Sequence, residues 1–119
     1  MAIEVTIVRA APEHLDAVRA CARAAYAKYV GPIGREPAPM IADFAGQIAE
    51  GWVDIALDPD ARVIGFVVGY PREDHFEDHF HVENLAVSPA AQGAGVGTRL
   101  LRHAEARARE LGLAAIELY

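Results

Sequence analysis

The turn from Gln92 to Thr98, with the sequence Gln-Gly-Ala-Gly-Val-Gly-Thr, constrains the fold more than any other part of the chain. It lies between an apolar, strand-like run, Val82 to Val87, and an amphipathic stretch that predicts a helix from Val96 to Leu111. Because three of its residues are glycines, few side chains cover the backbone at the start of that helix. The backbone N–H groups of the first turn and the positive end of the helix dipole are then accessible. Such a turn is suited to binding a phosphate or pyrophosphate group.

Two common phosphate-binding patterns fit this turn poorly. A Walker loop needs Lys after its last glycine, whereas Gly97 is followed by Thr98, and this difference excludes it. A dinucleotide-binding Rossmann turn needs a third glycine, and the chain has Leu100 at that position. Glu117 lies twenty positions after Gly97 and would suit the ribose-binding acid of that fold. A nicotinamide-dependent dehydrogenase therefore stays open as an alternative.

The same turn resembles the signature of the GNAT superfamily of acetyl-CoA-dependent N-acetyltransferases. That signature is Gln or Arg, two residues, Gly, one residue, and then Gly or Ala, and it is matched by Gln92, Gly95 and Gly97. The segments 84–89 and 98–101 resemble the strand, Ser-Pro turn and helix that flank the signature in this superfamily. The order of the predicted elements along the whole chain agrees with the resemblance.

The resemblance implies that acetyl-CoA is the co-substrate and that no metal is needed. The strand would hold the acetyl carbonyl and the pantetheine amides through its backbone, and the turn would hold the pyrophosphate. The expected coenzyme-binding residues are Leu85, Ala86, Val87, Gln92, Gly93, Ala94, Gly95, Val96, Gly97 and Thr98. The implied reaction is acetyl transfer to a primary amine of a small molecule or peptide, by direct attack on the thioester.

An amine is mostly protonated at neutral pH, so a general base would help it to attack. Three residues are candidates. Glu83 directly precedes the acetyl-binding segment, and His81 lies two residues earlier on the same face of the strand. Glu117 lies on the last predicted strand, where some protein-acetylating members of the superfamily carry a base. Each of the three has a structural alternative, because a titratable side chain alone indicates little about its pKa.

Hydrophobic periodicity predicts an α/β fold of the GNAT type, with a mixed, mostly antiparallel sheet flanked by helices in the order β-α-α-β-β-β-α-β. The predicted strands are Val5–Val8, Val53–Leu57, Val63–Tyr70, Val82–Val87 and Ala114–Tyr119. The predicted helices run from Pro12 to Tyr29, from Met40 to Ile48 and from Val96 to Leu111. The acceptor pocket is expected to lie at the first two helices, with Tyr26, Tyr29, Ile33, Met40 and Phe44 as candidate lining residues.

Members of the superfamily continue beyond the fifth strand, whereas this sequence ends at Tyr119. In many members the further part supplies a tyrosine that protonates the coenzyme A thiolate, and no residue here matches it. We expect a truncated form of a longer sequence. An unpartnered fifth strand favours pairing with another chain, as in a homodimer. A catalytically impaired acetyl-CoA-binding module, or a subunit of a larger assembly, is therefore the alternative function.

Composition and charge exclude several classes of architecture and of binding partner. A chain of 119 residues with 53% hydrophobic content is expected to form one domain, residues 1–119. Its net charge of −6 argues against nucleic acid as a partner, and it has no apolar run of membrane-spanning length. The absence of a signal peptide and the lone Cys21, expected to be a packed residue, fit a cytoplasmic location.

The motif Glu73-Asp74-His75-Phe76 is repeated at once as Glu77-Asp78-His79-Phe80. His75 and His79 are spaced to bind one metal ion only on a helix, and this stretch lies between two predicted strands, so a metal site is not expected. We interpret the repeat as a hairpin loop with an acidic rim. Together with Glu36 and Asp43, that rim would attract a cationic amine.

Overall fold

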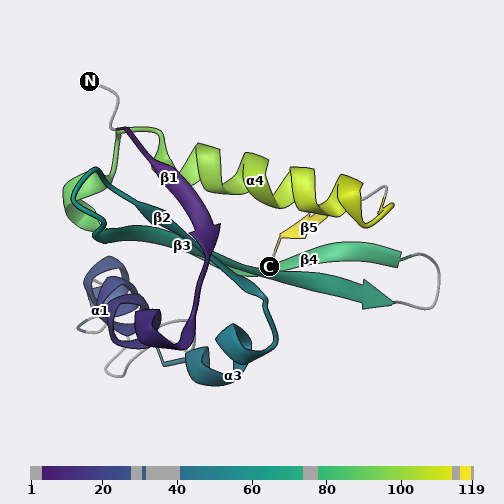
Figure 1. The fold of residues 1–119 in the computed structure, drawn as a ribbon, viewed down its shortest axis with the longest axis horizontal. Helices are drawn as coiled ribbons and strands as arrows, with labels where there is room; N and C mark the ends of the chain where they lie inside the picture. The colour runs from purple at the N-terminus through teal and green to yellow at the C-terminus, as the bar shows by residue number, and fades with distance from the viewer. Residues whose placement is uncertain (1–3, 28–30, 32–40, 74–77, 114–115, 119) are drawn as a thin grey trace.

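The computed structural model describes residues 4–27, 31, 41–73, 78–113 and 116–118. A five-stranded sheet has the order β1-β2-β3-β4-β5, in which the first four strands are antiparallel and β5 is parallel to β4 (Figure 1). The strands are β1 (Thr6–Arg9), β2 (Val53–Leu57), β3 (Val63–Glu73), β4 (Asp78–Val87) and β5 (Ile116–Leu118). The helices are α1 (Leu15–Tyr26), α3 (Phe44–Ala49) and α4 (Val96–Glu110), with short 3-10 turns η1 (Pro12–His14) and η4 (Pro89–Ala91).

Helices cover both faces of the sheet, with α1 and α3 on one face and α4 on the other (Figure 1). Alternate residues of the strands pack into two separate cores. On the α1/α3 face the core includes Val18, Phe44 and Phe66, and on the α4 face it includes Val67 and Leu100. The predicted mixed, mostly antiparallel fold is confirmed, and the antiparallel pairing excludes the parallel sheet that a Rossmann dehydrogenase requires.

Helix α4 starts at Val96, as predicted, and buries one stripe at four-residue spacing: Val96, Leu100, Ala104 and Ala108. It lies close to the sheet because Gly65 has no side chain. A Cβ at Gly65 would lie 3.0 Å from the Ala86 carbonyl oxygen and from Leu100 Cδ1. The predicted end of this helix at Leu111 is one residue too late, since α4 ends at Glu110, and Leu111 is 52% exposed.

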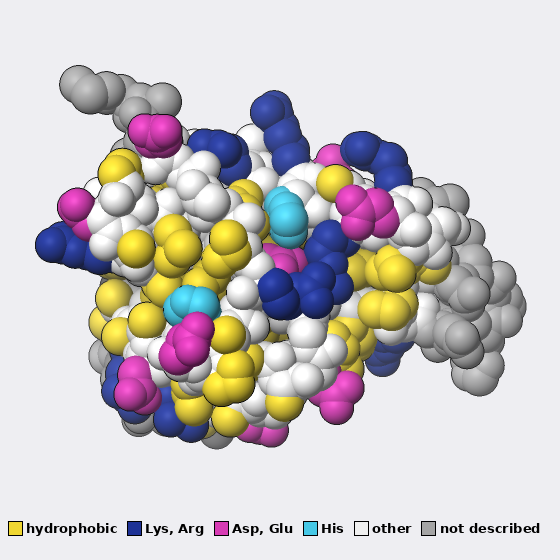
Figure 2. Space-filling model, viewed as in Figure 1, with side chains coloured by type: hydrophobic (Ala, Val, Ile, Leu, Met, Phe, Trp, Pro, Cys, Tyr) yellow, Lys and Arg dark blue, Asp and Glu magenta, His cyan; other side chains and the backbone are white. Residues whose placement is uncertain are grey.

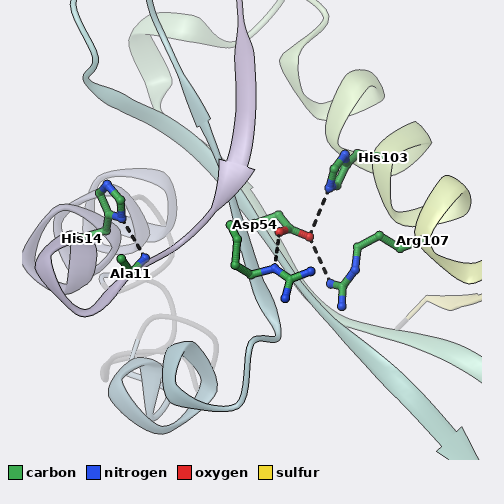
Figure 3. A network of polar contacts seen from close by, with 6 residues as sticks. Ala11, His14, Asp54, His103 and Arg107 are labelled. Carbon is green, nitrogen blue, oxygen red and sulfur yellow. Dashed lines mark hydrogen bonds and ion pairs between the residues drawn. The ribbon is translucent and has the colours of Figure 1, made fainter. Parts of the chain in front are cut away.

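The first two helices are shorter than predicted. Pro12 opens the turn η1, in which His14 Nδ1 accepts a hydrogen bond from the Ala11 N–H at 2.8 Å (Figure 3), and α1 begins only at Leu15. Helix α3 begins at Phe44 because the Asp43 carboxylate accepts a hydrogen bond from the Gly46 N–H. Ile41 lies outside this helix and is 62% exposed. Tyr29 and Met40 lie outside the described residues.

Strands β3 and β4 extend further than predicted and pair as far as Glu73 and Asp78. Most of the second half of the repeated motif therefore belongs to a strand. Phe80 is fully buried in the core, and His79 is buried as well. The interpretation of this part of the repeat as a solvated loop is wrong, and residues 74–77, between the strands, lie outside the described residues.

A buried carboxylate joins β1, β2 and α4. Asp54 lies on β2 with its side chain 2% exposed, and its Oδ1 accepts a hydrogen bond from Arg9 Nε at 2.9 Å. Its Oδ2 lies 3.1 Å from Arg107 Nη1 and 3.2 Å from His103 Nε2 (Figure 3). Figure 2 shows basic side chains and a histidine gathered around a largely covered acidic side chain on this face. The cluster satisfies a charge that would otherwise be costly to bury.

We expect Asp54→Ala to destabilise the fold by about 3 kcal/mol, because it leaves the partly buried Arg107 without its counter-charge. The matched control is Glu105→Ala, which removes an exposed pair with Arg109 at 3.9 Å and should cost less than about 1 kcal/mol. Urea unfolding measures both. Equal, small losses would show that the Asp54 cluster does not hold α4 on the sheet.

Candidate functional site

A β-bulge in β4 shapes the site. Val68 of β3 pairs with Asn84 and Gly69 pairs with Val82, so Glu83 has no partner across the ladder. A bulge bends its strand and changes the direction of the side chains around it. Glu83 and Asn84 are consecutive, yet both side chains contact tyrosines on the α1/α3 side of the sheet, as described below.

Within the described ranges, the pairing of β4 with its second neighbour ends next to the bulge. β5 pairs with β4 only along Phe80–Val82, opposite Ile116–Leu118. Among the described residues, no strand pairs with that edge of β4 from Glu83 to Val87. This free edge can bind an extended ligand by strand-like hydrogen bonds, although the Leu85 and Val87 carbonyls already accept hydrogen bonds from the side chains of Tyr26 and Gln92.

The glycine turn lies directly beside the free edge. Gly93 and Gly95 have φ values of 86° and 82°, and Gly95 is the N-cap of α4 without any side-chain capping bond. A Cβ at Gly97 would lie 3.6 Å from Val87 Cγ2 and 3.8 Å from Leu85 Cδ2. The start of α4 therefore packs against the same residues that carry the free edge. Together they offer uncapped N–H groups next to an unpaired strand.

The side chain of Gln92 ties the turn to the strand. Its Nε2 donates a hydrogen bond to the Val87 carbonyl oxygen at 3.2 Å. The sequence predicted that this amide would contact the coenzyme. In this structure the amide N–H instead fixes the distance between the end of β4 and the start of α4.

Tyr26, the last residue of α1, holds the bulge from the other side. Its hydroxyl donates to Asn84 Oδ1 at 2.8 Å and lies 3.3 Å from the Leu85 carbonyl oxygen. Tyr26 is therefore hydrogen-bonded to the bulge, and its part in an acceptor pocket stays a prediction. Phe44, in contrast, is a core residue, 1% exposed and in an edge-to-face contact with Phe66. The other predicted lining residues, Tyr29, Ile33 and Met40, lie outside the described residues, as does Glu36 of the predicted acidic rim.

Three aromatic rings run across the sheet beside the bulge. The ring of Trp52 stacks on that of Tyr70 with centroids 4.4 Å apart, and Tyr70 contacts the His81 ring at 5.3 Å. Burial raises the pKa of Tyr70, and the charge of Glu83 and a side-chain hydrogen bond with it raise this pKa further, while Arg72 acts in the opposite direction. The Tyr70 hydroxyl therefore keeps its proton and donates it in the hydrogen bond to the Glu83 carboxylate.

Two of the predicted base candidates, Glu83 and His81, lie at this point of the sheet. Glu83 is half-buried beside Tyr70, whereas His81 is only 1% exposed. The backbone of Glu117 on β5 is in register with that of His81. Sequence reasoning missed the Tyr70 contact with Glu83, because it depends on the bulge. The period-two pattern Phe66, Val68, Tyr70 could have placed Tyr70 on this face.

Cys21 is a packed residue, as expected. Burial raises the pKa of its thiol to about 11, although a hydrogen bond with the Ser88 backbone acts in the opposite direction. The thiol therefore stays protonated at neutral pH and is a poor nucleophile.

No three His, Cys, Asp or Glu side chains of the described residues are arranged to hold a metal ion. His75 of the repeated motif lies outside that part of the chain. The helices of the described ranges include none that is long and apolar enough to cross a membrane.

Comparison with known proteins agrees with this geometry. Residues 16–119 match the family model described as the Acetyltransferase (GNAT) family. The chain belongs to this family. It is 36% identical over 63 residues to an L-2,4-diaminobutyric acid acetyltransferase of Nocardia farcinica, a match that covers 53% of this chain and 32% of the relative.

A second curated relative is a mycothiol acetyltransferase of Pseudarthrobacter chlorophenolicus, 34% identical over 85 residues, with 66% of this chain and 26% of the relative covered. The chain thus spans about a third or less of the length of these relatives.

Solved structures share the fold. An aminoglycoside N-acetyltransferase in complex with CoA has a TM-score of 0.72 at 18% identity, covering 100% of this chain and 78% of the other. A tetramutant protein from Bacillus halodurans has a TM-score of 0.78 at 15% identity, covering 96% and 81%. At these identities the likeness establishes the fold alone. The family is named for acetyl transfer.

Proposed function

We propose that this chain transfers the acetyl group of acetyl-CoA to a primary amine of a small molecule, which attacks the thioester directly. The observation that carries the proposal is the free edge of β4 after the bulge, adjoining the uncapped start of α4. Acetyl-CoA has a pantetheine arm with amide groups that leads to a pyrophosphate, so its binding needs an unpaired strand edge beside a phosphate-binding turn. The strand edge can hydrogen-bond the amides, and the N–H groups at the start of the helix can bind the phosphates.

In this proposal the coenzyme contacts the residues expected from the sequence. The backbone of Leu85, Ala86 and Val87 binds the pantetheine arm and polarises the acetyl carbonyl. The pyrophosphate binds at the turn and the first turn of α4, formed by Gln92, Gly93, Ala94, Gly95, Val96, Gly97 and Thr98. Gln92 acts mainly by holding the turn, since its amide already donates to Val87.

Glu83 is the proposed general base. Its carboxylate is half-buried at the bulge, one residue before the free edge, and it makes no ion pair with another described residue. It would accept a proton from the ammonium group, directly or through a water molecule, and the neutral amine would then attack the thioester carbon. The C–S bond breaks as the amide forms, and coenzyme A leaves as the thiolate. The second candidates are Glu117 and, because of its burial, more weakly His81.

The names of similar proteins support a small-molecule acceptor. One relative is named for diaminobutyric acid, and several of the similar solved structures are aminoglycoside acetyltransferases. These compounds carry several amines, whereas a peptide acceptor has no such support among these names.

A pair of glycine variants tests coenzyme binding. Gly95 and Gly112 have similar φ values, 82° and 75°, and a Cβ at either position would meet nothing within 4 Å. Alanine at each should therefore cost about 1–2 kcal/mol of stability from the left-handed backbone. Only Gly95→Ala should also weaken acetyl-CoA binding, by about tenfold or more in calorimetry, because its methyl group would enter the space assigned to the pyrophosphate. Unchanged affinity in Gly95→Ala would contradict the proposed site.

Replacing the base gives the second test. Glu83→Gln preserves size but cannot accept the proton, so kcat/KM for an amine that turns over should fall by about 10²-fold or more. Acetyl-CoA affinity should stay unchanged. Glu110→Gln at the exposed end of α4 is the control and should keep full activity. A wild-type rate in Glu83→Gln would transfer the role of base to Glu117. If no amine in a panel of diamines and aminoglycosides released free thiol, the chain would be a binding module.

A further inference from the structure

We propose that the Trp52–Tyr70 ring pair binds a second ammonium group of the acceptor, so that the substrate class is an aliphatic diamine or polyamine. The inference rests on the proposed function, in which Glu83 deprotonates the reacting amine. It adds a separate subsite on the same face, formed by two half-buried rings, which holds a part of the substrate that does not react.

The rings have the properties that a cation subsite needs. Trp52 and Tyr70 are stacked with an interplanar angle of 28°, and both keep part of their surface exposed, while the neighbouring His81 is buried. The face of an indole or phenol ring attracts a cation, and tryptophan attracts it best. A stacked pair at the surface therefore offers an electron-rich, apolar contact suited to an alkylammonium group.

The position of the pair fixes the spacing of the two amines. The Gly69 N–H donates to the Trp52 carbonyl oxygen, so Trp52, directly before β2, lies beside β3, and Tyr70 pairs with His81 of β4. Neighbouring strands are about 4.8 Å apart, so the backbone of Tyr70 is about 5 Å and that of Trp52 about 10 Å from the line of β4. The Tyr70 side chain is hydrogen-bonded to Glu83, and the Trp52 ring lies beyond it with its centroid 4.4 Å from that of Tyr70. An acceptor with four or five carbons between its amines can place one nitrogen at Glu83 and the other on the rings. A two-carbon diamine is too short to reach Trp52.

The charges around the pair have opposing effects. Glu83 is hydrogen-bonded to Tyr70 and favours a cation nearby. Arg72, exposed and two residues further along β3, also acts on Tyr70 and repels a cation. The subsite thus predicts opposite effects for two single variants. Removing the Trp52 ring should weaken binding of the second ammonium group, and removing the Arg72 charge should strengthen it.

The test is the ratio of kcat/KM for 1,4-diaminobutane to that for 1-aminobutane, measured as thiol release from acetyl-CoA. We expect a wild-type ratio of about ten or more. This is well above the statistical factor of two that arises because a diamine has two equivalent reactive nitrogens. The corresponding ratio of 1,2-diaminoethane to 1-aminobutane should be smaller. Trp52→Leu should reduce the ratio three- to tenfold with little change for the monoamine. Arg72→Gln should raise the ratio. Because Arg72 is exposed, this variant tests the subsite even if Trp52→Leu fails to fold.

Each contrary result has a distinct meaning. A wild-type ratio near two, or ratios unchanged in both variants while thiol is released, would overturn the subsite and leave the proposed function standing. A preference for a neutral arylamine would also overturn it, because stacking and not charge would then be recognised. Absence of thiol release with every amine would overturn the proposed function and the subsite together.

Discussion

The bulge at Glu83 is the constraint on which the site depends. One extra residue in β4 shifts the pairing with β3 between Val68 and Gly69, next to the last described pair between β4 and β5, Val82 with Leu118. In the part of the chain that the structure describes, β4 is paired on only one edge beyond this point. A regular β4 would alternate its side chains strictly, and Glu83 and Asn84 could not both contact the α1/α3 face.

Hydrogen bonds from both helical layers fix the geometry around the bulge. On one face the Tyr26 hydroxyl, at the end of α1, holds Asn84 and the Leu85 carbonyl. On the other face Asp54 connects β1 and β2 to α4 through Arg9, His103 and Arg107. The guanidinium of Arg107 also lies over the ring of Phe80, 5.3 Å from its centroid, in the part of β4 that precedes the bulge. The start of α4 and the free edge are thereby held at a fixed distance, which preorganises the site.

The features that could be predicted from the sequence are local. The Gly-rich turn, the start of α4 at Val96 and the order of the strands follow from short-range periodicity and glycine placement, and the structure confirms them, although β3 and β4 are longer than expected. The start of α3 was mispredicted because the apolar residues Met40 and Ile41 outweighed the capping signal of Asp43.

Features that depend on pairing between strands were not predictable in this way. The contact of Tyr70 with Glu83 needs the register of β3 against β4, and the length of that hairpin depends on the burial of His79 and Phe80. The role of Asp54 needs three elements far apart in the sequence. Tertiary packing decides such features, and a single sequence carries no local signal for them.

The central claim is that the free edge of β4 and the start of α4 together form the acetyl-CoA site. Titration of the 15N-labelled chain with acetyl-CoA, followed by backbone amide chemical shifts, tests it most directly. The account predicts saturable shifts concentrated at residues 84–87 and 93–98, with little change at the middle of α4 around His103 and Arg107. Saturable shifts elsewhere in the sheet, or no shifts at millimolar coenzyme, would contradict it.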